Sequence, residues 1–104
     1  MSQPSIENYI ERHIEWSKRT FGPANRTEAI LKHIAKELEE VRADDRDIFE
    51  WADIIILAID GAWRAGATPA SIAATLEQKL KINNGRDWPD WRTANPNEPI
   101  EHKR

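Results

Sequence analysis

The sequence contains no cysteine, which excludes both a disulfide framework and a zinc site built from thiolates. A reducing cytoplasm is compatible with that absence, and a cytoplasmic protein is what we expect. Long apolar runs are missing as well: the longest, residues 54–59, is far too short to span a bilayer. The first ten residues also lack the basic region and the apolar run of a secretory signal.

There is no excess of positive charge either. Fifteen Lys and Arg residues stand against eighteen Asp and Glu residues, for a net charge of −3. A broad nucleic-acid-binding surface needs a basic patch, so we expect neither nucleic acid nor a membrane among the partners. A phosphate-bearing ligand stays possible if a metal bridges the charges.

No segment alternates apolar and polar residues as a strand does, and no internal repeat is visible. Helical spacing of apolar residues, punctuated by Gly and Pro, predicts an all-α domain. The four expected helices cover residues 5–20, 27–41, 48–65 and 69–85. We expect Thr27 or Asn25 to cap the second helix, and Thr68 to cap the fourth with Pro69 at its first position. The helical domain is predicted to comprise residues 1–92, and the proline-containing residues 93–104 to form a loose tail.

Four carboxylates in two pairs, Glu37-x-x-Glu40 and Glu50-x-x-Asp53, carry most of the chemical information. Residues three apart on a helix share a face, so each pair can aim two carboxylates at one point. If the second and third helices pack antiparallel, all four groups converge. Clustered carboxylates repel one another unless a cation fills the cluster, and oxygen ligands suit Mg²⁺ or Mn²⁺. The alternative is an ordinary solvated face, because acidic residues are abundant in this chain.

Helical phase favours the metal site. Glu37 and Glu40 fall at the border of an apolar stripe on the second helix, whereas Glu39 points away from it. The third helix is apolar almost all round, which predicts a central, buried helix. Its acids share one sector with Arg64, and burying them is costly without compensation. An ion pair between Asp60 and Arg64 explains one of these acids but leaves Asp53 unexplained.

Further candidates lie on the first and fourth helices. Lys79 and Asn83 share a face, and Arg86 follows the helix end, a combination that suits a polyphosphate. Surface lysines are the alternative. Trp16 could stack on a base, although an aromatic stripe is more often core. The histidines are isolated and read as structural or exposed, and no nucleophile pair is apparent.

Taken together, these motifs resemble the MazG-like all-α nucleoside triphosphate pyrophosphohydrolases. They are most similar to a phage and bacterial branch described as dATP/dGTP diphosphohydrolases. The likeness covers about residues 9–92. The matching stretches are Trp16-Ser17, Thr20-Phe21-Gly22-Pro23, His33, Lys36-Glu37-Leu38-Glu39-Glu40, Glu50-Trp51-Ala52-Asp53, residues 57–66, Lys79, Asn83, Arg86 and Trp88-Pro89. The gap between the two acidic pairs is shorter than in the general MazG pattern, which implies a tight turn.

The resemblance implies a four-helix core and hydrolysis of a purine dNTP, dGTP or dATP, to the monophosphate and pyrophosphate. Mg²⁺ or Mn²⁺ would be held by the four carboxylates, with Glu37 or Glu40 as general base. Trp16, Lys79, Asn83 and Arg86 would bind the substrate. In phages that replace adenine with 2-aminoadenine, such an enzyme supplies dGMP.

The abundance of apolar residues, including five tryptophans, also predicts a homo-oligomer, a dimer or tetramer. The family forms such assemblies too, with sites built from more than one chain. Two other functions remain open at this point: a non-enzymatic helical interaction module, and a metal-dependent hydrolase of another phosphorylated small molecule.

Overall fold

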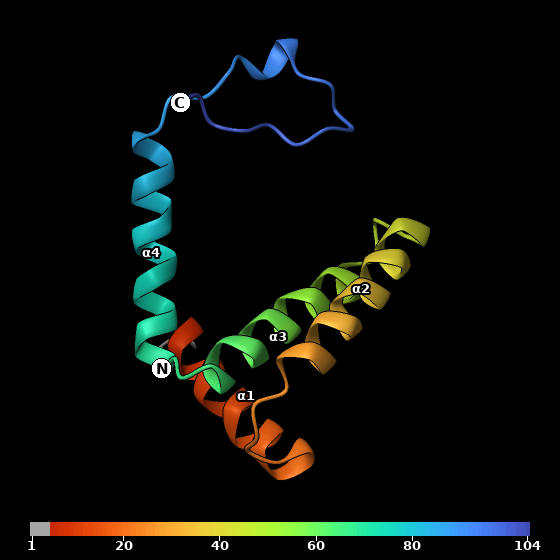
Figure 1. The fold of residues 1–104 in the computed structure, drawn as a ribbon, viewed down its shortest axis with the longest axis vertical. Coiled ribbons are helices and arrows are strands. Elements are labelled where there is room, and N and C mark those ends of the chain that lie inside the picture. The colour runs from red at the N-terminus through yellow and green to blue at the C-terminus, as the bar shows by residue number, and fades with distance from the viewer. Residues whose placement is uncertain (1–4) are drawn as a thin grey trace. The chain divides into compact units, whose positions relative to one another are not determined.

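The computed structural model describes residues 5–104, which form four α-helices and one short 3₁₀ turn (Figure 1). The helices are α1 (Ile6–Phe21), α2 (Thr27–Ala43), α3 (Ile48–Arg64) and α4 (Pro69–Gly85), and the turn is Trp91–Thr93. No strand occurs in this range, so the all-α prediction is confirmed. Residues 1–4, which belong to the segment tested for a secretory signal, lie outside it. No described helix has both the length and the apolar character needed to cross a membrane.

Local side-chain hydrogen bonds set where the helices begin. Ser5 caps α1 by accepting from the Asn8 backbone N–H, and Asp47 caps α3 in the same way. The predicted cap of α4 is confirmed, because the Thr68 hydroxyl accepts from the Ser71 backbone N–H.

The predicted cap of α2 was wrong by one residue. Arg26 occupies the N-cap position without a side-chain cap bond. The Asn25 side chain instead accepts from the Thr27 backbone N–H at 3.0 Å. The preceding loop therefore supplies the acceptor at this helix start, since the Arg26 side chain carries only donors.

The chain divides into two compact units, of which the first ends at Ala73. Within it, α2 and α3 run side by side, joined by the short turn at residues 44–47, and α1 packs against α3 (Figure 1). The buried apolar side chains are Ile10, Ile30, Val41, Ile59 and Trp63. They come from all three helices, so α3 is central to this unit as predicted.

Burial of α3 is nevertheless uneven. Its buried residues are Ile59, Asp60, Trp63 and Arg64, all in the C-terminal part. Near its start, Phe49 is 78 % exposed and Ile55 is 57 % exposed. The expectation of a helix buried along its whole length is therefore wrong for a single chain, in which α1 contributes only part of the cover.

The second unit, Ala74–Arg104, contains most of α4 and the segment that follows. The Trp88 indole N–H donates to the Asn83 carbonyl at 2.7 Å, and the Trp88 ring lies edge-on to His102. The Lys103 backbone N–H donates to the Asp87 carbonyl at 2.6 Å. These contacts close the end of the chain into a loop. A domain boundary at residue 92 stays a prediction.

A buried polar network around Asp60 joins α1 to α3. Asp60 Oδ1 accepts from the Ser17 hydroxyl at 2.5 Å and from the Trp63 indole at 2.8 Å, and His13 Nε2 lies 3.0 Å away. Asp60 Oδ2 accepts from Arg64 Nε at 2.9 Å, which confirms the ion pair expected from the sequence. Burial alone would raise the pKa of Asp60. The hydrogen bonds it accepts, that from Ser17 first, outweigh burial and hold the pKa below the ordinary 3.8.

We expect Asp60→Asn to lower the free energy of unfolding by about 3–5 kcal/mol, because it leaves the Arg64 guanidinium buried without a counter-charge. Urea unfolding at neutral pH measures the change. Since the pKa of Asp60 is lowered on folding, its contribution is complete above about pH 3.8 and is lost as the pH falls through the folded-state pKa. The deficit of the variant should therefore shrink in acid.

The matched control is Asp90→Asn, which removes an exposed pair with Arg92. Water screens exposed pairs, so this change should leave the unfolding midpoint nearly unchanged. Equal midpoints for Asp60→Asn and the wild type would show that the network adds nothing to stability.

Candidate metal and substrate site

The four predicted carboxylates meet between α2 and α3. Glu37 and Glu40 come from α2, and Glu50 and Asp53 come from α3. One oxygen of each lies within 4.8 Å of the others. The three-residue spacing places each pair on one helical face, and the packing of the two helices opposes those faces. An oxygen cluster of this size can surround a single divalent cation or a pair of them.

Two oxygens of this cluster are buried without a partner. Glu37 is only 6 % exposed, and its Oε1 lies 3.1 Å from His33 Nε2. Glu37 Oε2 and Glu50 Oε2 are both buried and accept no hydrogen bond from the described residues. A buried carboxylate oxygen without a partner is destabilising, and a bound cation satisfies it. The donor set therefore fits Mg²⁺ or Mn²⁺, both of which prefer oxygen ligands.

The electrostatics of the cluster agree with this fit. Burial is the main cause that raises the pKa of Glu37, followed by the adjacent Glu40 carboxyl and repulsion from Asp53, while His33 opposes the rise. Burial is also the main cause that raises the pKa of Glu50, and the adjacent Glu40 carboxyl is the next. Both carboxyls thus resist ionisation in the absence of a cation. A divalent ion removes that resistance, because it offsets the mutual repulsion.

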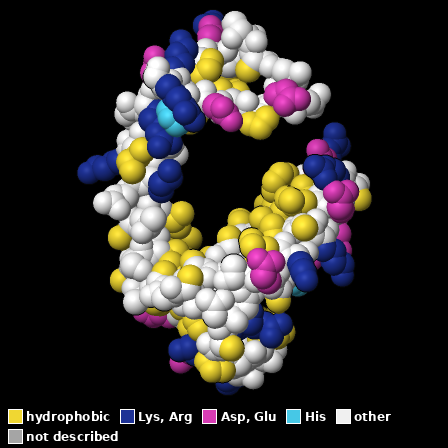
Figure 2. Space-filling model, viewed as in Figure 1, with side chains coloured by type: hydrophobic (Ala, Val, Ile, Leu, Met, Phe, Trp, Pro, Cys, Tyr) yellow, Lys and Arg dark blue, Asp and Glu magenta, His cyan; other side chains and the backbone are white. Residues whose placement is uncertain are grey.

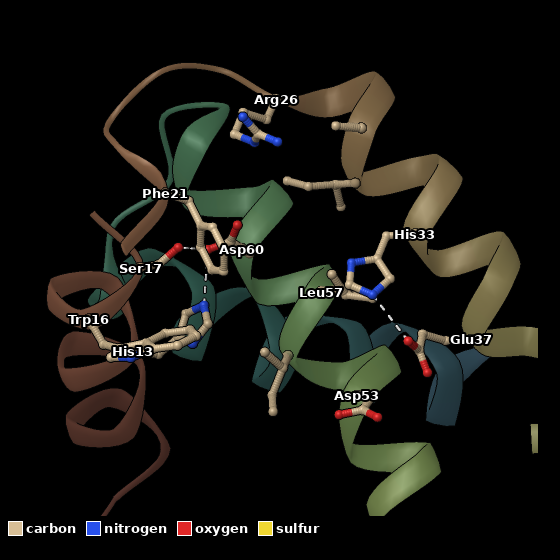
Figure 3. A pocket seen from close by; sticks show the side chains of 13 residues that line it. His13, Trp16, Ser17, Phe21, Arg26, His33, Glu37, Asp53, Leu57 and Asp60 are labelled. Atoms are coloured by element: carbon tan, nitrogen blue, oxygen red, sulfur yellow. Dashed lines mark hydrogen bonds and ion pairs between the residues drawn. The ribbon is translucent and has the colours of Figure 1, made fainter. Parts of the chain in front are cut away.

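A cavity of about 410 Å³ runs from this cluster to the aromatic residues of α1. Figure 3 shows Glu37 and Asp53 at one end, Leu57 and His33 between, and Trp16 and Phe21 at the other end. The remaining lining residues are His13, Ser17, Arg26, Ala29, Ile30, Ile56 and Asp60. With a divalent cation at the acidic end, and aromatic rings at the other, the cavity suits a ligand with a phosphate end and a planar end.

The aromatic end is accessible. Trp16 is 48 % exposed and meets Phe21 edge-on, with ring centroids 5.5 Å apart. The residue expected to stack on a base therefore lines the same cavity as two of the expected metal ligands. The alternative, that the aromatic stripe of α1 is core, holds for the neighbouring His13, which is 7 % exposed.

The other predicted substrate residues, Lys79, Asn83 and Arg86, lie in the second unit. Arg86 donates to the Asn83 side chain at 3.2 Å, so these two side chains form a local pair. Their contribution to the site stays a prediction.

Two residues that line the cavity, His33 and Arg26, were not predicted as site residues from the sequence. His33 was taken as isolated, although its place at the border of the apolar stripe, four residues before Glu37, was a usable signal. Arg26 precedes α2 in a loop, where no periodicity marks a residue. Glu39, which was expected to point away, is exposed and pairs with Arg42.

Ser17 and His13 do not form a nucleophile pair. Both contact the same oxygen of Asp60 rather than one another, and Ser17 is fully buried. These two residues therefore serve the Asp60 network, not nucleophilic catalysis.

Comparisons with known proteins bear on this site. The chain is 36 % identical over 93 residues to the Eaa protein of Salmonella phage P22, which covers 89 % of this chain and 29 % of that protein. It is 42 % identical over 74 residues to a dATP/dGTP diphosphohydrolase of Salmonella phage PMBT28, which covers 70 % of this chain and 24 % of that protein. The chain thus spans less than a third of the length of these curated relatives. No solved structure matched it.

The family model for dATP/dGTP pyrophosphohydrolases matches residues 9–104, nearly the whole chain. That range contains the four clustered carboxylates, the cavity and the Asp60 network. The chain belongs to the dATP/dGTP pyrophosphohydrolase family.

Proposed function

We propose that this chain hydrolyses purine deoxynucleoside triphosphates, dGTP or dATP, to the monophosphate and pyrophosphate in the presence of Mg²⁺ or Mn²⁺. The observation that carries the proposal is the pair of buried, unpartnered oxygens of Glu37 and Glu50 inside the four-carboxylate cluster. Family membership supports the reaction class, and the name of one relative supports the substrate. Supply of dGMP to a 2-aminoadenine pathway remains a prediction of the resemblance.

In this proposal Glu37, Glu40, Glu50 and Asp53 hold the metal. A divalent ion bound there would stabilise phosphate charge as a Lewis acid and would make water easier to deprotonate. Glu37 and Glu40 are the candidates for the general base that orients the attacking water and takes its proton. His33 contacts Glu37 Oε1 and thereby fixes the orientation of that carboxylate.

The rest of the substrate would follow the cavity. Trp16 offers a partly exposed ring on which a purine can stack. Leu57 and His33 line the intervening wall, where the sugar would lie. Lys79, Asn83 and Arg86 carry the donors suited to the outer phosphates, as the family resemblance implies.

The products test the proposed function. With dGTP or dATP and Mg²⁺, we expect dNMP and pyrophosphate in equal amounts, without accumulation of dNDP. Water attacks the α-phosphorus in this reaction, so ¹⁸O from labelled water should appear in the monophosphate. Anion-exchange chromatography and mass spectrometry measure both. Orthophosphate as the first product would reveal a phosphatase acting from the γ-phosphate and would contradict the proposal.

Glu50→Gln tests the metal site. We expect turnover to fall to background, and the rise in melting temperature on adding Mn²⁺ to disappear. The metal-free variant should melt above the metal-free wild type at neutral pH. The reason is that a carboxyl whose pKa is raised on folding destabilises the folded state when ionised. As the pH falls through the folded-state pKa toward 4.5, the wild type should regain this stability and the difference should vanish.

Glu39→Gln is the matched control. Glu39 belongs to the same sequence motif but points away from the cluster, is exposed and pairs with Arg42. It should leave the metal response and turnover unchanged. A Glu50→Gln variant with a normal Mn²⁺ response would exclude Glu50 as a ligand.

Apolar side chains exposed on α2 and α3 support self-association. Leu31, Ile48, Phe49 and Ile55 are each more than half exposed. Figure 2 shows hydrophobic side chains gathered along this helix pair. Each 100 Å² of apolar surface removed from water contributes about 2.5 kcal/mol, so covering such a surface favours a second copy strongly. We include a homo-oligomer, a dimer or tetramer, in the proposed function.

The unfolding midpoint should accordingly rise with protein concentration, because association binds only the folded state. Sedimentation at micromolar concentration should show a species larger than the 12.0 kDa chain. We expect Ile55→Glu to weaken the assembly, whereas Ile6→Glu, at a half-exposed position on α1, should not. A monomeric wild type would contradict self-association without bearing on the reaction.

A further inference from the structure

Arg26 places an uncommitted guanidinium beside the aromatic end of the cavity. It lines the cavity together with Phe21 and Trp16 (Figure 3). Within residues 5–104 its side chain forms no ion pair and donates no hydrogen bond, and it does not cap α2. The polar residues that share this end, His13, Ser17 and Asp60, hydrogen-bond within the buried Asp60 network. Arg26 is therefore the group lining this end whose several donors are free to recognise a polar ligand atom.

The position of Arg26 along α2 separates it from the phosphate end. It precedes Glu37 by eleven residues, which corresponds to about 16 Å along the helix axis. The backbone of Arg26 therefore stands about three helical turns before the carboxylates that would hold the phosphate. A nucleotide that lies along the cavity instead brings its base, not its phosphates, to the Arg26 end.

The backbone that carries Arg26 is held in place by Arg64. Arg64 Nη1 donates to the Gly22 carbonyl at 2.8 Å and to the Ala24 carbonyl at 2.7 Å. Gly22 has φ +82°, a conformation that favours glycine. Arg64 is itself fixed by Asp60, so the loop between Phe21 and Arg26 is anchored to the core. A donor on an anchored loop loses less entropy on binding and can discriminate between ligands.

The chemistry of a guanidinium distinguishes the two purines. Guanine presents two acceptors, O6 and N7, on one edge, and the paired N–H groups of arginine match them. Adenine presents N7 beside an N6 amino group, which is a donor and cannot bind a second arginine N–H. We propose that Arg26 reads the O6/N7 edge of the base and makes this chain prefer guanine over adenine nucleotides. The proposal rests on the proposed function, because it requires the phosphates to lie at the carboxylates.

Arg26→Ala and Arg26→Lys test the proposal. Calorimetric titration with dGMP and dAMP in Mg²⁺ buffer measures base affinity without turnover, and pyrophosphate release measures kcat/KM for dGTP and dATP. We expect wild-type protein to favour the guanine nucleotide. The guanine-to-adenine ratio should fall about tenfold in both variants, since a bidentate base contact contributes discrimination of that order. Lysine keeps the charge but lacks the paired donors.

Arg19→Ala is the control, since Arg19 is exposed on α1 and does not line the cavity. An equal loss of affinity for both nucleotides would place Arg26 at the phosphate or sugar and overturn the proposal. So would an unchanged ratio, or a wild-type ratio in Arg26→Lys. If wild-type protein releases no pyrophosphate, the proposed reaction fails, and the dGMP and dAMP titrations still decide whether Arg26 reads guanine. Arg26→Lys preserves the test if Arg26→Ala does not fold.

Discussion

The ion pair between Asp60 and Arg64 is the interaction on which the rest of the first unit depends. It buries two opposite charges at the contact of α1 with α3, and hydrogen bonds from Ser17, Trp63 and His13 complete the coordination of the carboxylate. A pair of this kind is stable only when every polar atom is matched. That requirement fixes the register of α1 against α3. The spare donors of Arg64 then hold the loop that leads into α2.

The carboxylate cluster shows the opposite condition, since its polar atoms are not matched within the chain. Glu37 and Glu50 are held close to other acids with one buried oxygen each left over, and their raised pKa values record the cost. The C-terminal part of α3 therefore holds the paired charges of Asp60 and Arg64, which stabilise the fold. Its N-terminal part holds the unpaired oxygen of Glu50, which belongs to the candidate metal site. Such a division is expected where a functional site is built into a small core, because strain at the site must be offset elsewhere.

The cavity links these two regions. The Asp60 network supports the aromatic end and the loop of Arg26, and the cluster forms the acidic end. In the proposed function, a single nucleotide would be recognised at its base and cleaved at its α-phosphate by residues that the α1–α3 and α2–α3 contacts position. Exposed apolar residues on α2 and α3 add a surface that a second copy of the chain would cover in the proposed homo-oligomer.

The sequence by itself determined where the helices lie and which acidic residues cluster. Apolar periodicity and the Gly and Pro positions located all four helices within a few residues, because these signals act locally. Three-residue spacing was enough to pair Glu37 with Glu40 and Glu50 with Asp53, and phase was enough to separate Glu39. Only the tertiary structure decided which carboxylate oxygens are buried without a partner, that His33 contacts Glu37, and that Arg26 lines the same cavity as Trp16. Those facts depend on how α1, α2 and α3 pack and on a loop held by an arginine forty residues away, and contacts at that separation leave no periodic trace in the chain.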